Sequence, residues 1–192
     1  MLDVDFFKNK IDELKDHLIY LTFYFQGEPY LHSKFLEMAK YASENKIYTA
    51  TSTNGHYLND QNARKTVESG LDRLIISIDG TSQETYENYR IGGTLDKVIE
   101  GTKNIIRWKK ELKSSKPHVV FQFLVVKQNE HQLAEVIRLA KELDVDDLQF
   151  KTAQIYDFEN GSPLIPENEK YSRYKQIESG KYELKNPLHN QC

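Results

Sequence analysis

The chain has 192 residues, with 26 Lys and Arg against 29 Asp and Glu and a formal net charge of −3, a length that suits one compact domain with a substantial core. The charges nearly balance and no basic face is interleaved with aromatic side chains, so we expect no nucleic-acid partner. No stretch reaches the roughly 20 apolar residues of a membrane span, and the N-terminal residues lack the basic-then-apolar order of a signal peptide, which predicts a cytoplasmic protein with no membrane partner.

Strand-like and helix-like segments alternate along residues 1–155. Helix starts are expected at Ser33, at a capping box from Thr81 to Glu84, and at Asn129. Five strands, each followed by a helix and joined by right-handed crossovers, predict an α/β fold whose parallel sheet closes or curves into part of a barrel. In chain order we expect a helix over 6–17, a strand over 18–25, a helix over 33–44, a strand over 46–51, a helix over 59–69, a strand over 73–78, a short helix ending near 89, a long helix over 95–113, a strand over 118–126, a helix after 129 and a strand over 147–153.

The alternation ends near residue 155, and the remainder is longer than an unstructured loop inside a compact domain normally is. This stretch contains three prolines, which argue against regular elements, and four tyrosines, which argue against plain disorder. We therefore expect a boundary near residue 155 and partial order over 156–192.

The apolar run over 18–25 stops at Gln26-Gly27-Glu28-Pro29. Such a run is typical of a buried strand in a parallel sheet, and the carboxyl ends of such strands carry the chemistry in barrel folds. Gly27 permits a turn and the close approach of a ligand, while Pro29 favours an extended Glu28. This pattern directs the Glu28 carboxylate toward the mouth of the fold, although the four residues alone could also be an ordinary turn.

Polar residues follow the next two expected strands in the same way. Asn54 lies in Thr53-Asn54-Gly55, a sequence that also suits a tight turn. Ser77 and Asp79 alternate along one side of their strand, and Asp79 could either close the following turn or line the mouth. Arg90 could pair with Glu87 on the surface or hold a ligand carboxylate.

Other motifs are missing from the chain. Its one cysteine, Cys192, excludes an intrachain disulfide and a cluster held by several of this chain's own thiolates. The six histidines lack the spacing of a metal site, so we assign no metal ligand. Neither a G-x-x-x-x-G-K loop nor a G-x-S-x-G elbow occurs, which argues against P-loop nucleotide hydrolysis and serine hydrolysis.

Taken together and in this order, the strand-end motifs resemble the radical S-adenosylmethionine (radical SAM) family, in the branch whose barrel precedes a cysteine-rich SPASM domain. The resemblance covers about residues 1–155. It implies a partial TIM-type (β/α)6 barrel with the first strand missing and five strands present. Residues 156–192 would then connect to the SPASM-like domain, with Cys192 at its first cysteine, and the chain would be an excerpt that lacks the family's C-x-x-x-C-x-x-C loop.

The resemblance also implies roles for the strand-end residues. Gly27 and Glu28, in the Gly27-Glu28-Pro29 turn, would accept hydrogen bonds from the amino group of S-adenosylmethionine (SAM). Ser77 and Arg90 would hold its ribose and its methionine carboxylate. The remaining members of the cofactor cavity would be Asn54 and Asp79.

The same family uses a 4Fe-4S cluster, whose ligands are not in this chain, and an external electron donor to cleave SAM to an adenosyl radical. That radical takes a hydrogen atom from a substrate, which in this branch is often a peptide or protein. The chain alone would be inactive. Two alternatives remain open: a barrel hydrolase with Glu28 and Asp79 as paired carboxylates, and a binding or scaffold barrel without chemistry.

Overall fold

The structure is a computed structural model that describes residues 2–186. Its α-helices are α1 Val4–Leu14, α2 Phe35–Glu44, α3 Asp60–Glu68, α4 Gln83–Tyr89, α5 Leu95–Glu111 and α6 Leu133–Glu142. Its strands are β1 Tyr20–Thr22, β2 Tyr48–Thr53, β3 Arg73–Ser77, β4 His118–Val125, β5 Asp147–Thr152, β6 Tyr174–Gln176 and β7 Tyr182–Leu184. Three short 3-10 helices complete the elements: η1 Pro29–Leu31, η2 Glu130–Gln132 and η3 Glu169–Tyr171.

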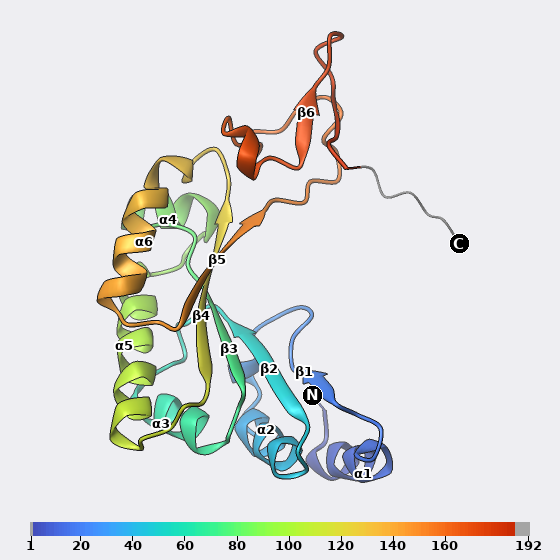
Figure 1. Ribbon diagram of the computed structural model, residues 1–192, viewed down its shortest axis with the longest axis vertical. Coiled ribbons are helices and arrows are strands. Elements are labelled where there is room, and N and C mark those ends of the chain that lie inside the picture. Colours follow the sequence, from blue (N-terminus) through green and yellow to red (C-terminus); the bar gives the residue numbers. More distant parts are fainter. Residues whose placement is uncertain (1, 187–192) are drawn as a thin grey trace.

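The first five strands form one parallel sheet in the order β1-β2-β3-β4-β5, which confirms the predicted α/β fold. Helices α3, α5 and α6 lie together on one face of this sheet (Figure 1). Because all five strands run in the same direction, their carboxyl ends meet at one edge of the sheet. The loops that carry the predicted site residues therefore gather at that edge.

The centre of the sheet is the best-packed part of the molecule. Side chains of β3 and β4 such as Leu74, Ile76, Phe121 and Phe123 are fully buried, and they belong to the same apolar cluster as Ile105 of α5. Strands that are buried on both faces have nearly continuous apolar sequences, and the sequence predicted such strands for β3 and β4. Within residues 2–186 no helix has both the length and the apolar composition needed to cross a membrane.

The prediction for the first strand was wrong in length and in burial. The strand covers only Tyr20–Thr22 instead of 18–25, and its residues are exposed or half-buried. Ile19 is 83% exposed and Phe25 is 93% exposed. Among the described residues β1 pairs only with β2, so no strand covers its outer side. Only part of the apolar run, including Leu21 and Phe23, packs against the small cluster that contains Phe7 and Ile11 of α1.

Two helix starts were also misplaced, because other side chains provide the acceptors. Helix α2 begins without a Ser33 cap, and the ring of His32 accepts the Lys34 N–H at 3.1 Å instead. Helix α4 is capped by Ser82 and not by Thr81, whose N–H donates to the Gln132 carboxamide at 2.8 Å.

Asn129 does not cap the helix that follows it. Its side-chain oxygen accepts the Val126 N–H at 2.9 Å, and its amide donates to the Leu124 carbonyl at 2.8 Å and the Asp79 carbonyl at 3.0 Å. This buried amide therefore joins the carboxyl end of β4 to the turn that follows β3, which is a long-range role that a local capping rule does not predict.

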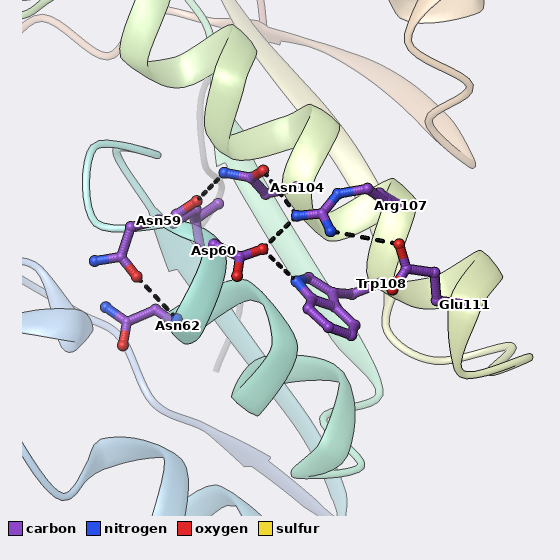
Figure 2. Close-up of polar contacts among 8 residues, drawn as sticks. Asn59, Asp60, Asn62, Asn104, Arg107, Trp108 and Glu111 are labelled. Carbon is purple, nitrogen blue, oxygen red and sulfur yellow. Dashed lines mark hydrogen bonds and ion pairs between the residues drawn. The ribbon is translucent and has the colours of Figure 1, made fainter.

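Helices α3 and α5 are joined on their outer side by the Asp60 carboxylate. Figure 2 shows this carboxylate between the Arg107 guanidinium and the Trp108 indole, which donates at 2.8 Å. The hydrogen bond from Arg107 and then that from Trp108 lower the pKa of Asp60. Arg64 of α3 also lies over the Trp108 ring, at 5.1 Å from its centroid.

Residues 154–186 are partly ordered, as expected from their tyrosines. They contain η3 and the antiparallel pair β6–β7, which lies beyond the carboxyl end of β5 (Figure 1). The Glu130 carboxylate anchors this segment by accepting the backbone N–H groups of Glu167 and Asn168, and the Tyr171 ring packs edge-on against Phe150 of β5. The role expected for Cys192 lies outside the described residues.

Candidate functional site at the carboxyl ends of the strands

The Glu28 carboxylate is fixed between the ends of β1 and β2. Its Oε1 accepts the Thr53 hydroxyl at 2.9 Å and the Tyr30 N–H at 3.2 Å, and its Oε2 accepts the Asn54 N–H at 2.7 Å. Pro29 begins η1 directly after Glu28, so the chain turns away at this point. The carboxylate thus faces the β2 loop, and it is not free in solvent.

Gly27 has the backbone geometry that the sequence predicted for a turn open to a ligand. Its φ is +85°, which disfavours any residue with a side chain, and no atom lies within 4 Å of the place where a Cβ would be. A ligand can therefore approach the peptide groups around Gly27 without a steric obstacle.

Asp79 and Arg90 form a second pair, between the end of β3 and the end of α4. Asp79 is 1% exposed; its Oδ2 accepts Arg90 Nε at 2.5 Å and its Oδ1 accepts the Leu124 N–H at 2.8 Å. Burial raises the pKa of Asp79, while Arg90 and then the Leu124 N–H act in the opposite direction. The alternative of an Arg90–Glu87 pair is wrong, because Asp79 takes the guanidinium.

Ser77 is buried at the end of β3 and lies one step along the sheet from Asn54. Thr53 pairs with Ile76 in the register of β2 and β3, so Asn54 and Ser77 follow as neighbours on adjacent strands. The structure thus joins Glu28 with Asn54 and Asp79 with Arg90 by hydrogen bonds, and puts Ser77 next to Asn54 through the strand register.

Two residues that hold this arrangement were missed in the sequence. Thr53 donates its hydroxyl to Glu28, and Asn129 holds the turn after Asp79. Thr53 stands next to Asn54 in the motif and could have been suspected. Asn129 is 50 residues from Asp79 along the chain, and no local pattern links the two.

The chain belongs to the Radical SAM superfamily, whose family model matches residues 1–140. It is 28% identical over 151 residues to the tungsten-containing aldehyde ferredoxin oxidoreductase cofactor-modifying protein of Pyrococcus furiosus, which covers 76% of this chain and 41% of that protein. It is 25% identical over 170 residues to the PqqA peptide cyclase of Bradyrhizobium diazoefficiens, covering 86% of this chain and 42% of the cyclase.

A solved structure with the same fold is SuiB of Streptococcus suis bound to S-adenosylmethionine. The TM-score is 0.66 at 14% identity, over 81% of this chain and 35% of SuiB. The likeness confirms the predicted fold class, a partial TIM-type barrel. The chain spans less than half the length of each of these three proteins.

The family uses SAM and a 4Fe-4S cluster, and the described residues suit only the first of these. Glu28 offers an oriented carboxylate for an amine, and Gly27 leaves room for a ligand to approach. Arg90 contacts Asp79 through Nε, which leaves its two terminal nitrogens for a ligand. Within residues 2–186 no three His, Cys, Asp or Glu side chains gather as a metal site, and the chain has one cysteine. The described part of the chain therefore offers no ligand set for the cluster.

Proposed function

We propose that this chain is the SAM-binding part of a radical SAM enzyme whose substrate is a peptide or protein. The observation that carries the proposal is the fixed Glu28 carboxylate beside the open Gly27 turn, at the edge where the ends of β1, β2 and β3 meet. Three donors hold the carboxylate in one orientation. A carboxylate has about four acceptor positions, so one remains for the ammonium group of the methionine moiety.

The other strand-end residues support the rest of the cofactor in this proposal. Arg90 presents its two terminal nitrogens to the methionine carboxylate, while Asp79 holds the guanidinium in place through Nε. Ser77 offers its hydroxyl to the ribose, and Asn54 forms the wall between Glu28 and Arg90.

In the intact enzyme the reduced cluster and SAM supply the radical chemistry. The residues of this chain bind and orient the cofactor and set the direction from which a substrate reaches it. A peptide substrate is favoured by the relative named PqqA peptide cyclase. Residues 156–186 would serve as the connector toward a SPASM-like domain, since they leave the sheet after β5 and are tied back to it through Glu130.

The hydrolase alternative lacks support from the site. A pair of catalytic carboxylates needs one acid that can give a proton to the substrate and one that is free to act as base or nucleophile. Asp79 is buried and bound to Arg90, and Glu28 is engaged by three donors. Neither carboxylate is presented in a form that suits glycoside cleavage.

The proposal is tested by titrating SAM into the chain and following binding by calorimetry and by NMR. Glu28→Gln removes the charge that the ammonium group meets, so we expect affinity to fall about tenfold or more. Glu142→Gln, an exposed acid at the end of α6, is the matched control and should bind as the wild type does.

A third variant distinguishes direct binding of SAM by Glu28 from a role of Glu28 in ordering the loop. Thr53→Val removes one hydrogen bond to Glu28 but keeps the carboxylate, and we expect a loss of affinity below about threefold. Equal binding by wild type and Glu28→Gln would contradict the proposal. Equal losses of SAM affinity in Glu28→Gln and Thr53→Val would indicate that Glu28 only holds the loop in place and does not contact SAM.

A further inference from the structure

An apolar groove of about 460 Å³ lies between helix α1, strand β1 and the start of α2. Aliphatic and aromatic side chains form most of its lining, and Lys10 is the only lysine, arginine or acidic residue among the lining residues. Three of the lining side chains, Leu2, Phe6 and Leu14, are about half exposed. A groove with so few polar groups suits an apolar side chain and not an ion or a polar ligand.

The outer edge of β1 presents unpaired backbone groups beside this groove. The Phe23 N–H and the Ile19 carbonyl both bond to the backbone of β2. Because the backbone groups of successive residues in a strand point to opposite sides, those of Tyr20 and Thr22 face away from β2. Among residues 2–186 no strand lies on that side. The edge can therefore pair with one more strand.

Large apolar side chains are exposed along this edge and in the groove. They are Leu2, Phe6, Leu14, Ile19, Tyr20, Tyr24 and Phe25. Together they expose roughly 900 Å², since a large apolar side chain presents about 150–250 Å² when it is fully exposed. A specific interface buries about 800 Å² on each partner. The apolar surface at the β1 edge thus has the size that a dimer needs.

A second copy of this chain fits the edge because each copy carries both halves of the contact. Phe25 follows β1 and is almost fully exposed, and the groove beside β1 has room for an aromatic ring. The opposite edge of the sheet is a poorer match for β1, because β5 carries Asp147, Gln149 and Lys151 among its six residues. The β1 edge is therefore complementary to itself.

We propose that the chain forms a two-fold symmetric dimer, in which the β1 strands of two copies pair antiparallel and Phe25 of each copy packs into the groove of the other. This inference does not depend on the proposed function. A two-fold axis at Thr22 sets Tyr20 of one copy opposite Tyr24 of the other. The same register brings Phe25 opposite Ile19, at the groove. Because this pairing uses the β1 edge of both copies, the assembly closes at two.

The dimer should be weak. Strand β1 has only three residues, and exposed side chains lose rotational freedom when they pack, so we expect a dissociation constant of about 10–100 µM. Below this concentration the chain is a monomer in which Phe25 is exposed. Dimerisation is therefore visible only when the chain is concentrated.

The test is sedimentation velocity of the 192-residue chain from about 2 to about 400 µM, where we expect a reversible change from monomer to dimer. Phe25→Asp puts a charge into the apolar groove and should weaken the dimer about tenfold or more. Tyr156→Asp is the matched control, because it adds the same charge in place of an aromatic ring that is 88% exposed in the C-terminal segment. The control should dimerise as the wild type does.

A second variant tests the backbone pairing. Thr22→Pro removes an outward-facing N–H and keeps the bonds of Ile19 and Phe23 to β2, so it should also weaken the dimer about tenfold or more. Hydrogen exchange gives an independent readout. The Tyr20 and Thr22 amides of the wild type should exchange about tenfold more slowly in the concentrated sample than in the dilute one.

A chain that stays monomeric at the highest concentration would overturn the proposal. A dimer that both Phe25→Asp and Thr22→Pro leave unchanged would also overturn it, because it would use another surface. Growth beyond two copies would contradict the closed arrangement and indicate pairing of β1 with β5. Slow exchange of the Tyr20 and Thr22 amides at every concentration would show that a different segment covers the edge, which would likewise overturn it.

Discussion

The central strands and the β1 edge carry similar apolar residues, yet they differ sharply in burial. Phe121 of β4 is 0% exposed, whereas Phe25, just after β1, is 93% exposed. Strand β4 has β3 and β5 on its two sides, while among the described residues β1 has β2 alone. Composition predicts a strand, but its neighbours decide whether the strand is buried. Glu28, beyond the end of β1, also depends on a neighbour, since two of its three donors, the Thr53 hydroxyl and the Asn54 N–H, come from the end of β2.

Removal of a buried aromatic ring should have the largest effect on stability and tests this comparison most directly. Phe121→Ala leaves a cavity between β3, β5 and the helices, so we expect a loss of about 3–5 kcal/mol in the free energy of unfolding. Phe25→Ala removes a ring of the same size from an exposed loop and should change it by less than about 0.5 kcal/mol. Urea unfolding of both variants measures the difference. Similar losses would show that the β1 region is packed in solution.

Substitution of two glycines at the strand ends should have the next largest effect on stability. A Cβ on Gly80 would lie 2.5 Å from the Tyr86 backbone nitrogen, so Gly80→Ala must displace the start of α4, at about 1–3 kcal/mol. Gly27→Ala meets no atom within 4 Å but has to adopt a φ of +85°, at about 1 kcal/mol. Thermal unfolding compares the two, and NMR shifts of Arg90 should change only in Gly80→Ala. Unchanged Arg90 signals would contradict the expected displacement of α4.

Two threonines of β2 provide a smaller and more selective comparison. Thr53→Val deletes the hydroxyl that donates to Glu28 and should cost about 1 kcal/mol in stability. Thr51→Val deletes a buried hydroxyl without a partner in the described residues and should be neutral or slightly stabilising. Equilibrium denaturation of both variants checks the expected order, and a greater loss in Thr51→Val would reverse it.

The smallest effect concerns the exposed Asp60 network and depends on pH. The pKa of Asp60 is lowered from 3.8 by the hydrogen bonds of Arg107 and Trp108, so its contribution to stability is present above pH 3.8 and disappears as the pH falls through the folded-state value. Asp60→Asn should therefore melt at a lower temperature than wild type at neutral pH. The difference should vanish in acid. If the difference in melting temperature persists in acid, the effect of the substitution is due to packing and not to the charge of Asp60.

Much of the fold could be predicted from the sequence because its signals are local. The spacing of Leu95, Val98, Ile105 and Ile106 gives the buried face of α5, and the apolar runs of β3 and β4 are long enough to identify buried strands. The order of strands and helices then leads to a parallel sheet. The extent of β1 could not be predicted, because it depends on what lies beside the strand.

The candidate site was predictable in part for the same reason. Gly27 and Glu28 stand in a short motif whose turn geometry the structure reproduces. Two of the three donors that orient Glu28 come from the end of β2, and the partner of Arg90 is Asp79 at the end of β3. Long-range hydrogen bonds of this kind depend on the folded arrangement, so a single sequence without an alignment does not reveal them.

The two edges of the sheet, β1 and β5, differ in the segments that pack beside them. At β5, the Tyr171 ring of the C-terminal segment packs against Phe150. At β1, Phe7 of α1 packs near Phe23, but among residues 2–186 no strand pairs with the outer side of β1. The β1 border can therefore accept a further strand by backbone hydrogen bonding without moving any existing one.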